Sequence, residues 1–80
     1  MTFEELVDKE RTYQDKLWGQ QNHRYPIWRT ILGEELGEMD KAFLEYYQGH
    51  GDTEPILKEL IQCAAVLKAM WESGKRNGWL

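Results

Sequence analysis

Two glutamates, Glu35 and Glu38, stand where a helix is expected to be apolar. A helix over Ile27–Tyr47 turns by about 100° per residue, which gathers apolar side chains on one half of its circumference and places both glutamates among them. These apolar residues are Ile27, Trp28, Ile31, Leu32, Leu36, Met39, Ala42, Phe43 and Tyr46. An ionised carboxylate buried without a partner costs several kcal/mol, so the pair requires a cation, a metal ion or a shared proton.

A second pair, Glu59 and Gln62, repeats the i, i+3 spacing on the next expected helix. Residues three apart lie on one helix face with about 4.5 Å of rise between them, so both reach a cation from the same side. Two facing helices with such pairs would form an all-oxygen cage, which suits Mg²⁺ or Mn²⁺. The alternative is that Glu34–Glu38 is a charged, solvated helix surface, and Glu34 does lie just outside the apolar arc.

Three helices are expected to position these groups. Thr2 and Glu5 predict a capping box for a helix over Phe3–Trp18, which a polar loop over Gly19–Pro26 follows. The second helix covers Ile27–Tyr47, and the third begins after a cap at Thr53 and ends at Ser73, with Gly74 as its C-cap. The third helix has a wide apolar arc made of Ile56, Leu57, Leu60, Cys63, Ala64, Leu67 and Trp71. Trp79, in the short tail, either docks on a neighbour or is free.

The composition predicts one all-α domain over residues 1–80, a helical hairpin plus an N-terminal helix. So short a chain buries a marginal core, and four Trp, four Tyr and two Phe are unusually large apolar groups to hide. We therefore expect a homodimer or homotetramer that completes a four-helix-type bundle. The net charge of −4 argues against nucleic acid as a partner, and no apolar run is long enough to span a membrane. The single Cys63 and the absence of an export signal predict a cytoplasmic protein.

The acidic residues also resemble a known family motif. Glu34-Glu35-x-x-Glu38, followed by Glu59-x-x-Gln62, resembles the EExxE and ExxD signature of the all-α nucleoside triphosphate pyrophosphohydrolases, the MazG-like group. The stretch Trp18-Gly-Gln-Gln-Asn-His23 also looks like small MazG-like proteins, so the resemblance covers roughly Arg11–Ala69.

The resemblance implies hydrolysis of an NTP or dNTP between the α and β phosphates, giving a monophosphate and pyrophosphate, in a nucleotide-pool or house-cleaning role. It implies Mg²⁺ as cofactor, with Mn²⁺ as a substitute, held by Glu35, Glu38, Glu59 and Gln62. Such an ion lowers the pKa of a bound water, which then attacks phosphorus, so no side-chain nucleophile is needed. Glu34 or Glu38 would hold or deprotonate that water.

Gln62 departs from the family pattern, which has aspartate at this position. Glutamine keeps a carbonyl oxygen as a ligand but removes one negative charge from the cage. Three interpretations remain open: a site with fewer ions, a register in which another acid substitutes, or a homologue that binds nucleotide with little turnover. The rival functions are accordingly a nucleotide-binding module and a helical interaction module.

Four residues are candidates for reading the base. Gln14 and Asn22 would hydrogen-bond the base edge while Trp18 stacks on it, and His23 would contact the base or a phosphate. Gln14 and Glu10 both fall on the apolar stripe of the first helix, where polar groups need partners. The structural alternative is that Trp18 is core, Gln14 caps the loop and His23 fixes its turn.

Overall fold

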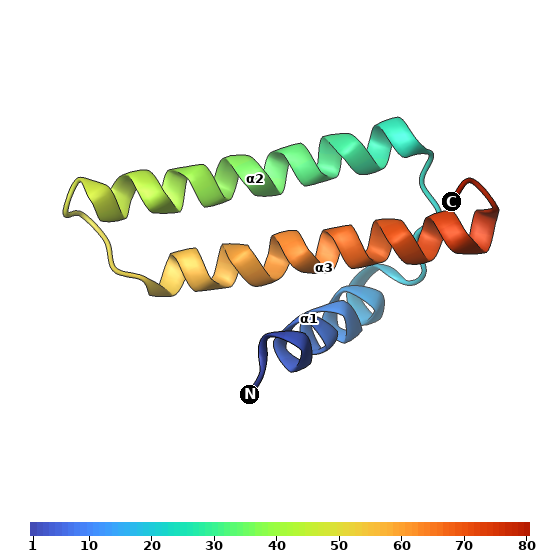
Figure 1. The fold of residues 1–80 in the computed structure, drawn as a ribbon, viewed down its shortest axis with the longest axis horizontal. Coiled ribbons are helices and arrows are strands. Elements are labelled where there is room, and N and C mark those ends of the chain that lie inside the picture. Colours follow the sequence, from blue (N-terminus) through green and yellow to red (C-terminus); the bar gives the residue numbers. More distant parts are fainter.

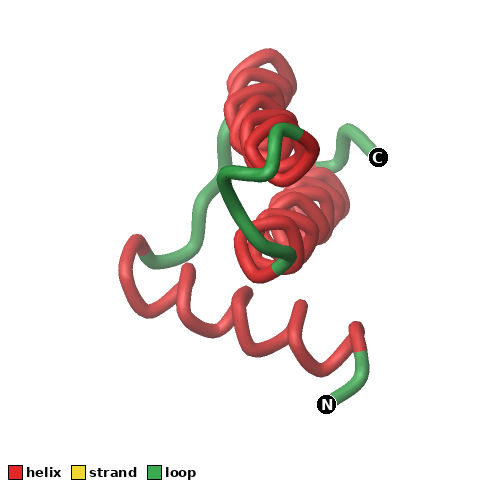
Figure 2. The backbone as a smooth tube through the Cα atoms, turned by 90° about the vertical axis from the view of Figure 1, so that its left-hand side faces the viewer, coloured by secondary structure: helices red, strands yellow, loops and turns green.

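The computed structural model describes all residues from 1 to 80 and contains three helices and no strand. They are α1 (Phe3–Trp18), α2 (Tyr25–Tyr47) and α3 (Glu54–Asn77). Helices α2 and α3 form a long antiparallel hairpin, and α1 crosses the other side of α3 (Figures 1 and 2). The prediction of an all-α fold with a helical hairpin and an N-terminal helix is confirmed. None of the three helices has the length and apolar character needed to cross a membrane.

The helix starts follow local hydrogen bonds. Thr2 and Glu5 form the predicted capping box, with mutual side-chain to backbone bonds of 3.0 and 3.1 Å. Helix α2 begins at Tyr25, two residues before the predicted start, because Pro26 fits the first turn, where its missing N–H costs nothing. Thr53 is the N-terminal flanking residue of α3, but its side chain makes no cap, and Asp52 Oδ1 instead accepts a bond from Glu54 N at 3.0 Å.

The predicted end of α3 at Ser73 is wrong, because the helix continues to Asn77 and stops at Gly78, whose φ is +79°. The chain then folds back, and the N–H groups of Trp79 and Leu80 both donate to the Gly74 carbonyl oxygen. Leu80 packs directly on Gly74, where an added Cβ would lie 2.5 Å from Leu80 Cδ1. Gly74 is therefore a close-packing position inside the helix.

The core consists of two small clusters on opposite sides of α3. Val7 of α1 packs with Ile61 and Ala65, whereas Trp28 of α2 packs with Val66 and Ala69. Trp79 joins the second cluster and meets Tyr25 edge-on at 5.8 Å between ring centroids, so the tail docks on its own chain. Small residues on α3 allow this central helix to contact a neighbour on each side.

The predicted apolar arc of α3 is only partly buried. Ile56 and Cys63 are buried, but Leu57, Leu60, Leu67 and Trp71 are exposed, since α1 and α2 cover other faces of the helix. Sixteen large apolar side chains in the whole chain are exposed, against eleven residues of any type that are buried. The isolated chain thus buries little of its apolar surface.

Candidate functional site

The carboxyl groups of Glu35 and Glu59 meet between α2 and α3, in the middle of the hairpin. Both side chains are half-buried, since each projects from the face by which its helix contacts the other. Partial desolvation, reinforced by the charge of Glu59, a hydrogen bond to it and the charge of Glu38, raises the pKa of Glu35 above its ordinary value. The pair therefore favours a shared proton or a bound cation, as the wheel position of Glu35 predicts.

Gln62, one turn beyond Glu59, completes this cluster. Its terminal amide atom lies 3.1 Å from Glu59 Oε2 and 3.2 Å from Glu35 Oε2. With nitrogen at this position, the amide donates a hydrogen bond to each carboxylate, the favoured orientation when nothing else is bound. With oxygen at this position, its distances to the two carboxylate oxygens are close to the spacing of neighbouring ligands of an octahedral Mg²⁺, about 3.0 Å for bonds of about 2.1 Å. The donor set therefore fits a small hard cation.

The other two glutamates of the motif lie outside this cluster. Glu38 is exposed and lines a separate shallow hollow of about 190 Å³ with Lys41, Ala42, Glu45, Pro55 and Glu59. Glu34 is exposed to solvent. No three acidic, histidine or cysteine side chains come together with the geometry of a metal site. Glu59 is thus the residue shared between the Glu35–Gln62 cluster and Glu38, and further ligands for an ion would come from water or a phosphate.

An aromatic-walled hollow opens beside Glu35 and Gln62. It has a volume of about 190 Å³ and lies where the side chains of all three helices and the first loop approach one another. Its lining residues are Glu10, Gln14, Trp18, Gln21, Trp28, Ile31, Glu35, Gln62 and Val66. Two indole rings and several amide and carboxyl groups are the side chains that hold a planar heterocycle.

A partly buried arginine, Arg11, fixes the polar edge of this hollow. Arg11 Nη1 donates to Gln14 Oε1 at 3.2 Å, and the same guanidinium pairs with Glu72 of α3 at 3.0 Å. Because Arg11 has only donors, the Gln14 amide must turn its nitrogen away from it, and Gln14 Nε2 donates to Glu10 Oε2 at 3.3 Å. Glu10 and Gln14, the polar residues on the apolar stripe of α1, therefore have hydrogen-bond partners. Together they carry both hydrogen-bond donors and acceptors.

Asn22 and His23 lie outside this hollow. Asn22 Oδ1 accepts bonds from Arg76 and Asn77, so it ties the first loop to the end of α3. His23 packs edge-on against Trp28 with ring centroids 5.0 Å apart, and its Nε2 is buried without a hydrogen-bond partner. Of the four predicted base-reading residues, the structure brings Gln14 and Trp18 to the hollow.

Five residues that line the hollow were not predicted as site residues from the sequence: Glu10, Gln21, Trp28, Ile31 and Val66. Glu10 carried a usable signal, since it stands on the apolar stripe of α1 next to Gln14. Trp28 counted as core, and it is 2% exposed, yet one of its faces forms a wall of the hollow. A core residue of α2 can serve both roles because α1 and α2 do not pack on each other, which leaves space between them.

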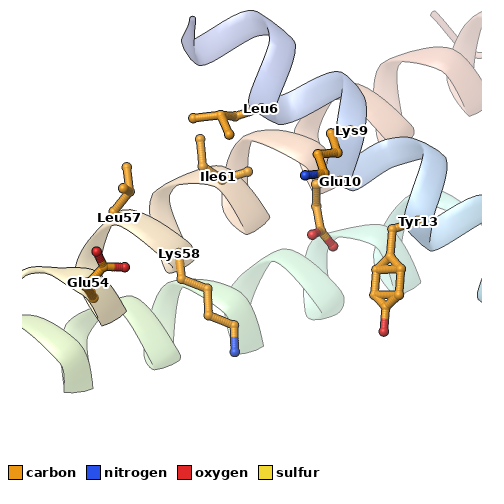
Figure 3. Close-up of a pocket in the computed structure, with 8 residues that line it drawn as sticks. All are labelled: Leu6, Lys9, Glu10, Tyr13, Glu54, Leu57, Lys58 and Ile61. Carbon is orange, nitrogen blue, oxygen red and sulfur yellow. The ribbon is translucent and has the colours of Figure 1, made fainter. Parts of the chain in front are cut away.

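A larger, more open hollow of about 400 Å³ lies between α1 and the first turns of α3 (Figure 3). It is lined by Leu6, Lys9, Glu10, Tyr13, Glu54, Leu57, Lys58 and Ile61. Its two lysines are offset by two glutamates, and none of its residues belongs to the carboxylate cluster. Only Glu10 is shared with the aromatic-walled hollow.

Cys63 is buried beside the acidic cluster. Burial, together with the charges of Glu35, Glu59 and Asp40, raises the pKa of its thiol above the ordinary value. A thiol held protonated in this way is a poor nucleophile and a poor metal ligand. The chemistry of the site thus rests on oxygen and amide groups.

Comparison of the chain with models of known families, with curated proteins and with solved structures found no match.

Proposed function

We propose that this protein is a metal-dependent nucleoside triphosphate pyrophosphohydrolase that acts in the cytoplasm on NTPs or dNTPs. The observation that supports it best is the convergence of Glu35 and Glu59 on the Gln62 amide, at 3.2 and 3.1 Å, beside an aromatic-walled hollow. A cluster of oxygen ligands next to a hollow that fits a planar ring suits a substrate that combines a phosphate chain with a base. The family resemblance of the glutamate motif points to the same chemistry.

In this proposal the carboxylates of Glu35 and Glu59 would hold Mg²⁺ or Mn²⁺, and the carbonyl oxygen of Gln62 would be a third ligand. The ion supplies charge neutralisation of the triphosphate and a water of lowered pKa. Glu38, which shares a hollow with Glu59, orients or deprotonates the attacking water, with Glu34 as the outer alternative. Trp18 stacks on the base, and Gln14 and Glu10 hydrogen-bond its edge.

The second candidate is a nucleotide-binding protein with little turnover. The observation that favours it is the amide of Gln62, whose nitrogen can bridge Glu35 and Glu59 and so replace a cation between them. An ion must then break two hydrogen bonds before it binds, and it meets two carboxylates instead of three. Binding of a nucleotide would persist under this proposal, while pyrophosphate release would be slow.

Pyrophosphate release across the common NTPs and dNTPs, with Mg²⁺, Mn²⁺ or EDTA, tests the proposal. We expect metal-dependent release that favours some bases over others, and equal amounts of monophosphate and pyrophosphate. Nucleotide binding without release would support the second candidate. If no nucleotide binds and neither Mg²⁺ nor Mn²⁺ raises the melting temperature, both are wrong, because a ligand bound only by the folded state must stabilise it.

Exchanging Gln62 for aspartate is expected to have opposite effects with and without metal. Without metal, Gln62→Asp removes two donated hydrogen bonds and places a third carboxylate beside Glu35 and Glu59, which should lower the free energy of unfolding by about 1–3 kcal/mol. With Mg²⁺, the added charge should tighten metal binding about tenfold or more and increase turnover. Calorimetric metal titration and melting curves with Mg²⁺ or EDTA measure both. A variant that is equally destabilised in both conditions would contradict the metal assignment.

A further inference from the structure

The aromatic-walled hollow carries negative charge and no positive charge. Two of its nine lining residues, Glu10 and Glu35, are carboxylates, and none is a lysine, an arginine or a histidine. Glu10 lies near enough to Glu35 for its charge to contribute to the raised pKa of Glu35. Because a carboxylate accepts hydrogen bonds and donates none, a ligand in the hollow meets an excess of acceptors.

Arg11 determines which end of the Gln14 amide faces Glu10. Arg11 Nη1 donates to Gln14 Oε1 at 3.2 Å, and Gln14 Nε2 donates to Glu10 Oε2 at 3.3 Å. Arg11 is itself held by Glu72 at 3.0 Å and by Asp15 at 3.1 Å, and its side chain is 15% exposed. A reversed amide would place its nitrogen against the guanidinium and its oxygen against the carboxylate, so it would lose both hydrogen bonds. The orientation of Gln14 is therefore fixed.

This orientation leaves one free donor next to several free acceptors. Gln14 Nε2 keeps one N–H after its bond to Glu10, and a carboxylate has about four acceptor sites, of which that bond uses one. An exocyclic amino group next to a ring nitrogen, as in cytosine and adenine, matches this pattern because it offers two N–H donors and an adjacent acceptor. Uracil instead offers a single N–H flanked by two carbonyl oxygens, which the carboxylate repels.

The other two amides of the hollow are not fixed in this way. Gln21 contributes its backbone carbonyl oxygen to a hydrogen bond with Arg76, which leaves its side-chain amide free to turn toward any base. Gln62 directs its amide at Glu35 and Glu59. Discrimination between bases therefore depends on the edge formed by Glu10 and Gln14.

We propose that Glu10 selects nucleotides whose base carries an exocyclic amino group, and that Arg11 positions the Gln14 amide for this selection. The selectivity rests on the proposed function and names the class of base that the hollow takes. At about 190 Å³ the hollow is smaller than the roughly 300–1,000 Å³ of sites for drug-sized ligands, so it suits one ring system and leaves the phosphates outside. Trp18 supplies a stacking face that any base can use, and Glu10 supplies the discrimination.

Nucleoside binding by the unmodified chain in EDTA tests the proposal without phosphate, metal or turnover. We expect cytidine to bind at least about tenfold more tightly than uridine, and adenosine to bind more tightly than inosine, because a well-paired base edge discriminates by about that factor. NMR titrations that follow the Gln14 side-chain amide and the Trp18 indole N–H measure the dissociation constants. Equal binding within either pair, a preference for the carbonyl base, or no binding of any nucleoside would overturn the proposal.

Glu10→Gln should reduce the preference for cytidine over uridine to about threefold or less, because glutamine keeps the size but can donate to a carbonyl oxygen. Arg11→Met should reduce the preference as well, since the Gln14 amide is then free to turn, whereas a merely structural role would weaken both nucleosides equally. The matched control is Glu4→Gln, which changes an exposed acid of α1 outside this hollow and should keep the wild-type preference. An unchanged preference in Glu10→Gln would contradict the proposal.

An analogue of cytidine covers the case in which a variant fails to fold. The ribonucleoside of pyrimidin-2-one lacks the 4-amino group, so it should bind the unmodified chain at least about tenfold more weakly than cytidine. Binding as tight as that of cytidine would refute selection through the amino group. Pyrophosphate release with equal kcat/KM from CTP and UTP would also refute it while leaving the proposed function in place, whereas an amino preference without release would do the reverse.

Discussion

Glu35→Gln is expected to reduce pyrophosphate release by about 100-fold or more while leaving the helices intact. The substitution keeps the size of the side chain but removes one of the two carboxylates that meet between α2 and α3. Metal-ion stabilisation of a transition state is worth several kcal/mol, and each 1.36 kcal/mol corresponds to about tenfold in rate. Initial rates at saturating Mg²⁺, together with the circular dichroism spectrum, measure the effect.

The same substitution is expected to raise the stability of the metal-free protein at neutral pH. Because the folded state raises the pKa of Glu35, the folded chain binds a proton more tightly than the unfolded chain. The stabilising contribution of that proton is complete below the unfolded pKa of about 4.3 and is lost as the pH rises through the folded pKa. Above this pH range, the Glu35 carboxylate of the wild type is ionised and is repelled by the charge of Glu59. Glutamine is uncharged, so the substitution removes this repulsion.

Asp40→Asn is the matched control, since Asp40 is an exposed acid on the same helix that lines none of the hollows. It removes the same charge from α2 and should change neither turnover nor the response of the melting temperature to Mg²⁺. In EDTA, denaturation at pH 5 and pH 8 should show Glu35→Gln gaining stability relative to wild type at the higher pH. Full activity in Glu35→Gln would show that this carboxylate holds no essential ion.

The cluster itself was largely predictable from the sequence, for a physical reason. Glu35 and Glu59 are polar residues at positions whose helical period is apolar, and that conflict marks a side chain held between helices. The same argument also predicted Glu38 among the apolar residues, and there it is wrong, because Glu38 is exposed. Glu38 is three residues beyond Glu35, so its side chain is rotated by about 60° around the helix axis. This rotation is enough to move it out of the buried face of α2.

The hollow and the third helix were less predictable, because they depend on contacts between distant segments. A helical wheel identifies the apolar arc of α3, but it does not show which part of that arc α1 and α2 cover. Leu67 and Trp71 belong to the arc and remain exposed to solvent. The end of α3 was also not predictable from the sequence. Gly74 has the residue type of a C-cap, but in the structure it lies inside the helix, and Leu80 packs on it.

Trp28→Ala is expected to lower the free energy of unfolding by about 3–5 kcal/mol, the largest stability effect of any single truncation in this chain. Trp28 is 2% exposed and is the largest side chain of the cluster that joins α2 to α3. Truncation removes the transfer free energy of the indole and leaves a cavity that Val66 and Ala69 cannot fill. A domain of this length has about 4–12 kcal/mol in total, so the variant should be partly unfolded at 25 °C. Urea denaturation followed by circular dichroism measures the loss.

Trp28→Phe separates the packing of the ring from its polar group. Trp28 Nε1 is buried without a hydrogen-bond partner, so phenylalanine removes an unsatisfied donor as well as part of the ring. These two effects oppose each other, and the loss should stay below about 1.5 kcal/mol. A loss as large as that of the alanine variant would mean that Nε1 has a partner in solution. Tyr47→Ala, which truncates an aromatic side chain that is 89% exposed, should change stability by no more than about 0.5 kcal/mol.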